Sequence, residues 1–413
     1  MSSSGPDGIT PRRILFISPS ATIGGAERSL LELISGLPAG RFEPHLLLPR
    51  DGPLADVARA AGARVSVIEW PAPLLRLGRE RTLANRFLPV LAPLFLLPVL
   101  VRIARFVRQN KIDLVHTNGT KSHLVSWPAT VIARIPLVWH IRDVLAPGAL
   151  STAMRQLGRI LPSMIIANSQ ASAGPMTAGQ HNGRVRVIYN GLDLTTFKPV
   201  EPDSELRRSL RIEPSSFVIG ALGALTPLKG HVHLIRAMPE VGSRIPEARL
   251  VIVGAEMYDT VGHQGYRAFL EAEIERLGLT GSVILAGRRE ELVPLYSIMD
   301  VVVNCSVRPE SFGRTLIEAM ACEKPVISTD LGGPREIIVD RVQGIFVPPA
   351  DPSALAGSII ELYADPARRE AMGRAGRRRV MEAFTVERHV TEVCEVYDKL
   401  LRIPPGSRVS SSP

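Results

Sequence analysis

The most informative stretch of the sequence is Pro309-Glu310-Ser311-Phe312-Gly313-Arg314-Thr315-Leu316-Ile317-Glu318-Ala319-Met320-Ala321, which follows the apolar run Asp300-Val301-Val302-Val303-Asn304. Its spacing predicts a buried strand, a loop and a helix whose apolar stripe leaves Glu318 outside. Backbone N–H groups at residues 311–315 would lie at the helix start, where they and the helix dipole favour a phosphate group. Glu310 and Glu318 can accept hydrogen bonds from sugar hydroxyls. The stretch therefore predicts a nucleotide-sugar site.

Each glutamate taken alone also has a simpler interpretation. Glu318 could be a solvated helix residue and Glu310 a loop carboxylate, because short patterns give many false positives. The predicted fold provides the context that decides between these interpretations.

Short apolar runs alternate with helical stretches twice along the chain, which predicts two parallel, doubly wound α/β sheets. The expected strands of the first half are 13–18, 45–48, 65–68, 113–117, 137–140, 164–168 and 186–188. Those of the second half are 217–222, 249–253, 283–286, 300–304, 325–328 and 345–347. A connector rich in proline and charge lies at about 195–216. Ligands of such sheets bind beyond the carboxyl ends of the strands, so we expect a cleft where the two sheets face each other.

Several segments resemble one enzyme family. They are Glu318-Ala319-Met320-Ala321-Cys322, Lys324-Pro325-Val326-Ile327, Gly332-Gly333-Pro334-Arg335-Glu336, Gly24-Gly25-Ala26-Glu27, Val138-Trp139-His140-Ile141-Arg142-Asp143, Ile188-Tyr189-Asn190-Gly191-Leu192-Asp193 and Lys229-Gly230. The chain from about residue 13 to 401 resembles the retaining glycosyltransferases of family 4, also called glycosyltransferase group 1, which have the two-domain GT-B fold.

This resemblance implies a set of site residues. The catalytic candidates are His140, which would hydrogen-bond the transferred sugar, Lys229, which would contact the diphosphate, and Glu310. The donor-binding candidates are Gly24, Gly25, Lys229, Glu310, Ser311, Phe312, Gly313, Thr315, Leu316 and Glu318. Glu27, Arg142, Asp143 and Asn190 are second-rank candidates. Alone, Lys229 could be an ordinary helix-start lysine, the Gly24-Gly25 pair a tight turn, and His140 a structural histidine.

The chain departs from the family pattern at one position. The family has a Gly-Arg-Leu segment before the Lys-Gly pair, whereas this chain has Gly223-Ala224-Leu225. Arg288, Arg289 and Arg314 are candidates to replace the missing arginine.

Length and resemblance together predict the domain plan. A chain of 413 residues is long enough for two domains. We expect a disordered tail at 1–10, an N-terminal acceptor-binding Rossmann-like domain at 11–195, a C-terminal nucleotide-sugar-binding Rossmann-like domain at 196–385, a helix at 386–403 that crosses back to the N-terminal domain, and a disordered tail at 404–413. Both tails are rich in Ser, Pro and Gly, and their few apolar residues cannot offset the entropy of ordering.

The family resemblance implies transfer of a hexosyl group from a UDP- or GDP-type sugar with retention at the anomeric carbon. Glu310 and Glu318 are accounted for by donor binding, so no pair of carboxylates is left as acid and nucleophile, and front-face attack is expected. No Asp-x-Asp pair occurs in the sequence, so neither a metal nor another cofactor is expected. A catalytically silent sugar-nucleotide or membrane-binding protein, and a GT-B epimerase or phosphorylase, stay open as alternatives.

Charge and hydropathy favour a membrane-borne acceptor. Residues 1–200 hold 23 Lys and Arg against 11 Asp and Glu, a net charge of +12, whereas the remainder holds 26 against 29. An uncharged run at 87–101 lies within a basic segment, 76–111. This run is too short to span a bilayer, and its three prolines should break a helix. It could lie on an anionic membrane surface or form a core helix. A nucleic-acid partner is not expected, because aromatic residues are only 5% of the chain.

The remaining features indicate the compartment. The N-terminal residues do not resemble a signal peptide, and Cys305, Cys322 and Cys394 form no disulfide or metal pattern. We therefore expect a cytoplasmic protein that acts in envelope glycolipid or polysaccharide synthesis, at the inner face of the cell membrane if its acceptor is lipid-linked.

Overall fold

A computed structural model describes residues 10–71, 88–145, 147–177, 183–256 and 265–403 of this chain. The chain divides into two compact units. The first contains the chain up to Gly191 together with the chain from Val386 onward, and the second is Leu192–Thr385. We call them the N-unit and the C-unit.

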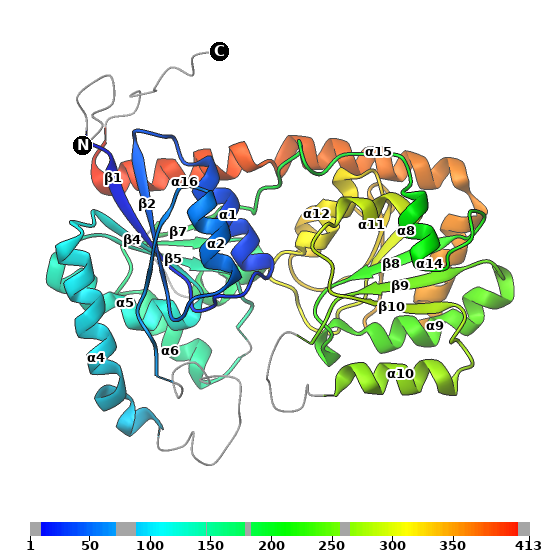
Figure 1. Ribbon diagram of the computed structural model, residues 1–413, viewed down its shortest axis with the longest axis horizontal. Coiled ribbons are helices and arrows are strands. Elements are labelled where there is room, and N and C mark those ends of the chain that lie inside the picture. The colour runs from blue at the N-terminus through cyan, green and yellow to red at the C-terminus, as the bar shows by residue number, and fades with distance from the viewer. Residues whose placement is uncertain (1–9, 72–87, 146, 178–182, 257–264, 404–413) are drawn as a thin grey trace. The chain divides into compact units, whose positions relative to one another are not determined.

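The N-unit is built on a seven-stranded parallel sheet with the order β3-β2-β1-β4-β5-β6-β7 (Figure 1). Its strands are β1 (Arg12–Ile17), β2 (Phe42–Leu48), β3 (Arg64–Val67), β4 (Leu114–Asn118), β5 (Leu137–Ile141), β6 (Met164–Ala167) and β7 (Val185–Val187). Its helices are α1 (Gly25–Gly36), α2 (Pro53–Ala60), α4 (Leu88–Gln109), α5 (Thr120–Ala133), α6 (Ala149–Gly158), α7 (Gln170–Thr177) and α16 (Val386–Leu401).

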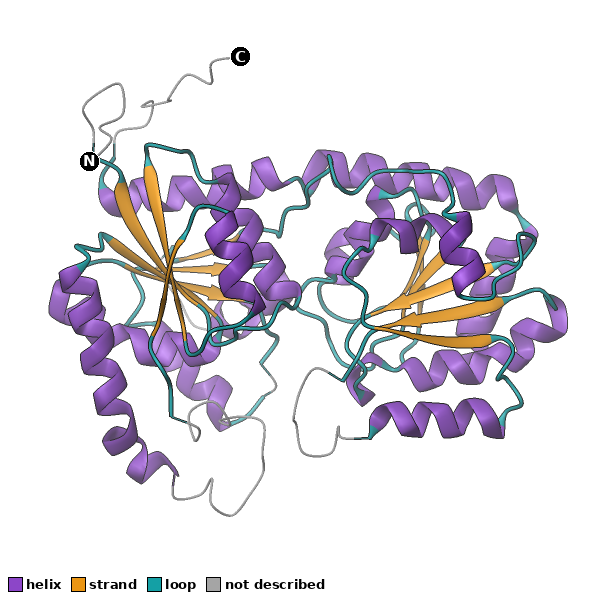
Figure 2. Cartoon of the chain, viewed as in Figure 1, coloured by secondary structure: helices purple, strands orange, loops and turns teal. Residues whose placement is uncertain are grey.

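Helices cover both faces of this sheet, as Figure 2 shows. Strand β1 explains why, because its alternate residues enter two different cores. Ile14 and Phe16 pack with α1, α2 and α16, whereas Leu15 and Ile17 pack with α4, α5 and α6. A strand that is apolar at every position therefore requires two helical layers.

The last helix, α16, completes the first of these layers. Its buried residues include Val390, Val393 and Tyr397. The Tyr397 ring meets Phe42 edge-on, with centroids 5.6 Å apart. A Cβ atom added at Gly36 would lie 2.6 Å from Val390, so the small residue lets α1 and α16 approach closely. The helix expected at 386–403 thus belongs to the N-unit.

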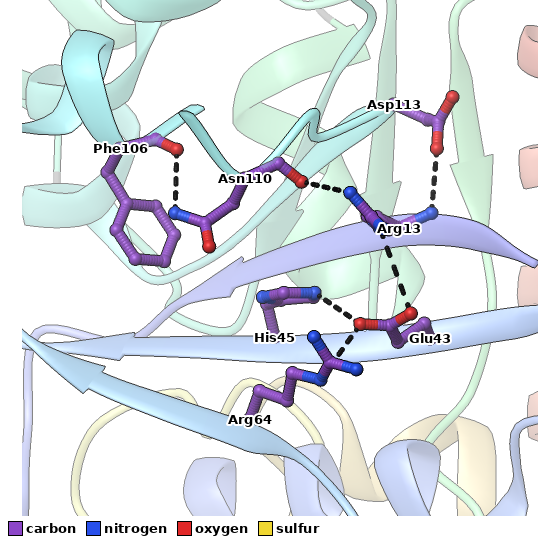
Figure 3. A network of polar contacts seen from close by, with 7 residues as sticks. All are labelled: Arg13, Glu43, His45, Arg64, Phe106, Asn110 and Asp113. Carbon is purple, nitrogen blue, oxygen red and sulfur yellow. Dashed lines mark hydrogen bonds and ion pairs between the residues drawn. The ribbon is translucent and has the colours of Figure 1, made fainter. Parts of the chain in front are cut away.

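A polar network ties the beginnings of the N-unit strands together (Figure 3). Glu43 on β2 forms ion pairs with Arg64 at 3.0 Å and with Arg13 at 3.7 Å, and it contacts His45 at 2.9 Å. The Arg13 side chain also donates to the Asn110 carbonyl at 2.9 Å, and its backbone N–H donates to Asp113 at 2.8 Å. These contacts fix the strand ends that lie opposite the functional edge of a parallel sheet.

The C-unit contains a six-stranded parallel sheet with the order β10-β9-β8-β11-β12-β13. Its strands are β8 (Val218–Leu222), β9 (Arg249–Val253), β10 (Val283–Gly287), β11 (Val301–Asn304), β12 (Val326–Thr329) and β13 (Gly344–Val347). Its helices are α8 (Ser204–Ser209), the 3-10 turn η2 (Pro227–Lys229), α9 (His231–Arg244), α10 (Tyr266–Arg276), α11 (Val293–Ile298), α12 (Arg314–Ala321), α13 (Pro334–Ile337), α14 (Pro352–Ala364) and α15 (Pro366–Ala383). The α/β prediction of two doubly wound parallel sheets is confirmed.

Helix α4 contradicts one expectation from the sequence. Prolines 89, 93 and 98 do not break it, because the helix runs without interruption from Leu88 to Gln109. Val99, Ile103 and Val107 are buried against the sheet, as in a core helix, whereas Leu97 and Val101 are 59% and 40% exposed. Residues 76–87 of the expected membrane segment lie outside the described residues. Within the described parts of the chain, no helix combines the length and the apolar character that crossing a bilayer requires.

Helix α15 holds α12 in place through two glycines. A Cβ atom added at Gly373 would lie 2.0 Å from the Glu323 carbonyl oxygen, just after the end of α12, and one at Gly376 would lie 3.1 Å from Met320. Glycine at these positions lets the two helices pack at short range, so the position of α12 depends on them.

We expect Gly373→Ala to destabilise the C-unit by about 1–3 kcal/mol, because the added methyl group would overlap backbone that cannot move freely. The matched control is Gly357→Ala on α14, where nothing lies within 4 Å of the added atom and the gain in helix propensity is about 0.5–1 kcal/mol. Urea denaturation of both variants measures the difference. Equal stability of the two variants would contradict the packing described.

Candidate functional site

Each sheet reverses its strand order once. Lys229 and Glu310 lie at the reversal of the C-unit, whereas His140 lies on β5, one strand beyond the reversal of the N-unit. The reversal lies between β1 and β4 in the N-unit and between β8 and β11 in the C-unit. At such a point the connections leave in opposite directions and open a crevice beyond the carboxyl ends of the strands.

In the C-unit the reversal brings Lys229 and Glu310 together. Lys229 ends the 3-10 turn after β8, Glu310 lies in the loop after β11, and the Lys229 Nζ atom donates to Glu310 Oε1 at 2.6 Å. Ser306 also donates to that oxygen. Burial alone would raise the pKa of Glu310, but the Lys229 ammonium and the hydrogen bonds from Ser306 and Asn304 outweigh it and hold the pKa below its ordinary value. The pair is therefore charged at neutral pH.

Glycines allow the loops around this ion pair to approach one another. Gly332 has a φ of +75°, and a Cβ atom there would lie 2.4 Å from the Glu310 carbonyl oxygen. A Cβ atom at Gly333 would lie 2.5 Å from the Cα of Phe312, and one at Gly230 would lie 2.1 Å from the Cys305 carbonyl oxygen. The Gly333 N–H donates to Glu310 O at 2.8 Å. Glycine is thus required in the Lys229-Gly230 and Gly332-Gly333 segments, because any side chain there would overlap the backbone of a neighbouring loop.

In the loop that leads into α12, the side chains of several expected donor-binding residues are buried, so the backbone is the main group that this loop can offer to a ligand. Gly313 precedes the helix with a φ of +107°. The Phe312 and Leu316 side chains are 2% and 0% exposed, and Phe312 packs edge-on against Phe384. The Leu316 N–H already donates to Gly313 O. Of the expected donor-binding residues 311–316, Ser311 and Thr315 are only partly buried.

Glu318 does not lie where the periodicity placed it. It is 2% exposed rather than outside the buried face of the helix. Arg314, one turn earlier, donates to Oε1 at 2.8 Å, and the Tyr296 hydroxyl donates to Oε2 at 2.9 Å. The two donors compensate the carboxylate for its burial, and each oxygen keeps a lone pair for a ligand hydroxyl. The expectation that Glu318 stands off the buried stripe is therefore wrong.

The family pattern has an arginine where this chain has Ala224, and Arg288, Arg289 and Arg314 are the candidates to replace it. Arg314 is 9% exposed and is held by Glu318. Arg289 donates to the Ala286 carbonyl at 3.2 Å, and both it and Arg288 are exposed. Lys229 is the cation for which the structure shows an ion pair with Glu310.

In the N-unit, His140 is the centre of a fully buried polar cluster. It lies on β5, and its Nδ1 atom is 3.0 Å from Nε2 of His116 on β4. The Nδ1 atom of His116 is 2.6 Å from the hydroxyl of Tyr397 on α16. Burial, and secondarily the Arg142 charge, lowers the pKa of both histidines well below the ordinary value, so both are neutral at pH 7.

Arg142 is the charged member of this cluster. Its Nε donates to Asn118 at 2.5 Å, its Nη1 donates to Asn190 at 2.7 Å, and Ser29 donates to the same Asn190 oxygen at 3.0 Å. Arg142 and Asn190 thus hold the ends of strands and loops together. Sequence reasoning missed Ser29, His116, Asn118 and Tyr397, because only the fold brings them near His140.

At the start of α1, one of the two glycine N–H groups expected to face a ligand already has a hydrogen-bond partner. Glu27 accepts a hydrogen bond from the Gly24 N–H at 3.1 Å, so this amide is already engaged. Burial raises the pKa values of Glu27 and Asp143. Gly25 begins α1 and leaves the helix N-terminus as the feature of this segment that can meet an anion.

No group of three or more His, Cys, Asp or Glu residues that could hold a metal ion occurs among the residues that the structure describes. The three cysteines are free and buried.

Two family profiles match this chain, one on each half. The profile described as Glycosyltransferase Family 4 matches residues 23–196, and the one described as Glycosyl transferases group 1 matches residues 202–379. The boundary between the matches lies close to the division between the two units at Gly191 and Leu192.

Individual proteins show the same similarity. A D-inositol 3-phosphate glycosyltransferase of Segniliparus rotundus is 32% identical over 64% of this chain, and the match spans 61% of that relative's length. A glycosyltransferase of Methanocaldococcus jannaschii is 30% identical over 70% of this chain and 75% of its own. The crystal structure of Anabaena HepE in complex with UDP and glucose has a TM-score of 0.80 at 28% identity, covering 94% of this chain and 99% of HepE.

The buried histidines predict that stability falls in mild acid. The pKa values of His45, His116, His123, His140, His231 and His233 are all lowered, that of His123 to about 3 and that of His231 to about 4. Below pH 6.5 the histidines of the unfolded chain bind protons, whereas the buried histidines of the folded chain stay neutral. The free energy of unfolding therefore decreases as the pH falls from 6.5 toward the folded-state pKa values of these histidines. We expect a loss of about 1.4 kcal/mol at pH 5.5 for each fully buried histidine.

Urea denaturation at pH 7.5 and pH 5.5 measures this loss, and calorimetry at pH 5.5 measures the proton uptake on unfolding. The raised pKa values of Glu27 and Asp143 act in the opposite direction but involve fewer groups. Equal stability at the two pH values would contradict burial of neutral histidines.

Proposed function

Because the chain belongs to the family 4 and group 1 glycosyltransferases and has the GT-B fold, we propose that it transfers a hexosyl group from a nucleoside-diphosphate sugar to a hydroxyl of a glycan or lipid-linked acceptor, with retention at the anomeric carbon. The observation that carries the proposal is the charged Lys229–Glu310 pair at the strand reversal of the C-unit. One member carries the positive charge that a diphosphate needs, and the other is a hydrogen-bond acceptor for a sugar.

The donor is a nucleoside-diphosphate sugar, with a UDP-sugar the first choice. Support comes from the HepE structures, which were solved with UDP, with UDP and glucose, and with UDP-glucose. A GDP-sugar such as GDP-mannose is the second choice. In this proposal the backbone from Ser311 to Thr315 receives the phosphates, while Glu318 accepts hydrogen bonds from hydroxyls of the nucleotide.

The reaction follows from what these residues can supply. As the bond to the sugar breaks, the diphosphate gains negative charge, and the Lys229 ammonium stabilises it. A leaving phosphate oxygen accepts the proton of the attacking hydroxyl on the same face, so no separate carboxylate nucleophile is needed. His140 hydrogen-bonds the transferred sugar. Neither a divalent metal ion nor another cofactor takes part in this proposal.

We expect the purified protein to release nucleoside diphosphate from UDP- or GDP-sugars when an acceptor is present, and NMR of the product to show the donor's anomeric configuration. Lys229→Ala should lower kcat about 10²–10³-fold, because a fixed charge at the leaving group is lost. The matched control, Lys198→Ala, removes an exposed lysine of the same unit and should leave kcat unchanged.

Inversion in the product would reject the retaining mechanism. Loss of turnover on chelation, restored by one metal, would reject the metal-free mechanism. A protein that binds UDP but turns over no donor would be the catalytically silent alternative, and consumption of donor without an acceptor would favour an epimerase or phosphorylase.

The acceptor is membrane-borne in this proposal, and the enzyme works in the cytoplasm at the inner face of the membrane. Support comes from α4, which exposes Leu97 and Val101 beside three exposed arginines, Arg102, Arg105 and Arg108. Helix α5 packs against α4 and exposes Trp127, Val131 and Ile132. Apolar side chains next to cationic ones are the composition that binds anionic lipid surfaces and suits envelope glycolipid or polysaccharide synthesis.

We expect the double variant Leu97→Asp, Val101→Asp to bind phosphatidylglycerol vesicles at least about tenfold more weakly than the wild type in flotation, because two apolar side chains no longer enter the interface. Both positions are exposed, so folding should be retained. Val339→Asp is the matched control, since Val339 is 52% exposed in the C-unit. Equal flotation of the double variant and the wild type would defeat the membrane proposal.

A further inference from the structure

Three fully buried side chains form one continuous chain of hydrogen bonds in the N-unit. The Tyr397 hydroxyl lies 2.6 Å from His116 Nδ1, and His116 Nε2 lies 3.0 Å from His140 Nδ1. The residues come from α16, β4 and β5, and each is 0% exposed. The chain of contacts therefore connects the last helix of the protein to the histidine that the proposed function places on the sugar.

A contact with Arg142 shows in which direction the hydrogen bonds of these three side chains run. Its Nη2 atom lies 3.4 Å from His140 Nδ1. A guanidinium only donates, so His140 Nδ1 is an acceptor, and the single proton of the neutral ring is on Nε2. His116 Nε2 faces the same acceptor and must therefore donate. His116 then accepts at Nδ1, which makes the Tyr397 hydroxyl the donor.

The environment keeps all three groups in this protonation state. Burial, then the Arg142 charge and the neighbouring histidine His389, lowers the pKa values of His116 and His140, whereas burial raises that of Tyr397. The groups facing these three side chains are thus Arg142, which is always cationic, the histidines His123 and His389, and the Cys394 thiol near Tyr397. None of them is an anion that would favour imidazolium.

The chain of hydrogen bonds ends at the Nε2 atom of His140, a donor that has no acceptor within the described residues. His140 Nε2 is buried and has no hydrogen-bond partner among the residues that the structure describes. Buried polar atoms are almost always paired in folded proteins, so such an atom marks a place where a ligand atom completes the pairing. A sugar hydroxyl, which can accept a hydrogen bond, has the required chemistry.

We propose that Tyr397 and His116 are positioning residues that hold His140 in the tautomer with its proton on Nε2, so that His140 donates a hydrogen bond to a hydroxyl of the transferred sugar. The sugar-binding part rests on the proposed function, whereas the tautomer is a property of the protein alone. Helix α16 thereby supplies the first donor of a chain that ends at the sugar.

Tyr397→Phe tests this proposal, because it removes one hydroxyl and keeps the ring that packs against Phe42. We expect kcat/KM for transfer to fall about tenfold, which corresponds to one net hydrogen bond. The Kd for UDP should not change, since UDP lacks the hexose. The ¹⁵N signals of His140, identified by their loss in His140→Ala, should move toward a mixture of the two tautomers. A purely structural role would lower Tm without shifting these signals.

Tyr363→Phe is the matched control. The Tyr363 hydroxyl donates to Glu247 at 2.6 Å in the C-unit. The control therefore deletes the same kind of hydroxyl group at a place that does not contact the histidines. This variant should keep the kcat/KM and the His140 signals of the wild type.

Three outcomes separate this proposal from the proposed function. If the wild type transfers sugar and Tyr397→Phe keeps both kcat/KM and the His140 signals, the positioning role is overturned and the enzyme assignment stands. If the wild type transfers no sugar, the assignment fails, and the wild-type ¹⁵N signals still decide the tautomer. A proton on Nε2 of His140 supports the hydrogen-bond direction, and a proton on Nδ1 overturns it. The same wild-type measurement decides the question if Tyr397→Phe does not fold.

Discussion

The ion pair between Lys229 and Glu310 is the contact around which the C-unit site is arranged. A parallel sheet brings side chains from distant segments together only where neighbouring strands end, and β8 and β11 are neighbours although 78 residues separate the end of one from the start of the other. Both loops must then approach closely, which explains Gly230, Gly332 and Gly333. A larger residue at any of these positions would push apart the loops that bring the two charges within 2.6 Å.

The N-unit handles its buried polar groups differently. There, neutral histidines and amides surround Arg142, whose guanidinium donates to Asn118 and Asn190. Desolvation keeps the histidines uncharged. Each neutral ring has one donor nitrogen and one acceptor nitrogen, so the histidines orient the hydrogen bonds of the cluster without adding charge to it. In the proposed function, the C-unit offers a charge pair for the diphosphate, and the N-unit offers a hydrogen-bond donor for a sugar hydroxyl.

The sequence predicted the fold well because strands and helices have distinct hydrophobic periods. Every expected strand is present within a few residues. The roles that the family resemblance implies for Glu310, Lys229 and His140 stay predictions. Periodicity failed for Glu318, because its burial depends on Tyr296, a residue outside the helix that compensates the carboxylate. The expectation that three prolines would break a helix was also wrong, because packing of Val99, Ile103 and Val107 against the sheet stabilises α4. The contact of Tyr397 with His116 spans 281 residues, a separation at which no local pattern gives a signal.

The division of the chain has a consequence for biosynthesis. The C-unit is one continuous segment, Leu192–Thr385, whereas the N-unit needs α16, which is translated after the whole of the C-unit. On the ribosome the first sheet therefore emerges early but keeps the face that α16 covers open to water, while the second unit already has all of its own elements. Although domains usually mature in the order of synthesis, here the unit made first is the one completed last.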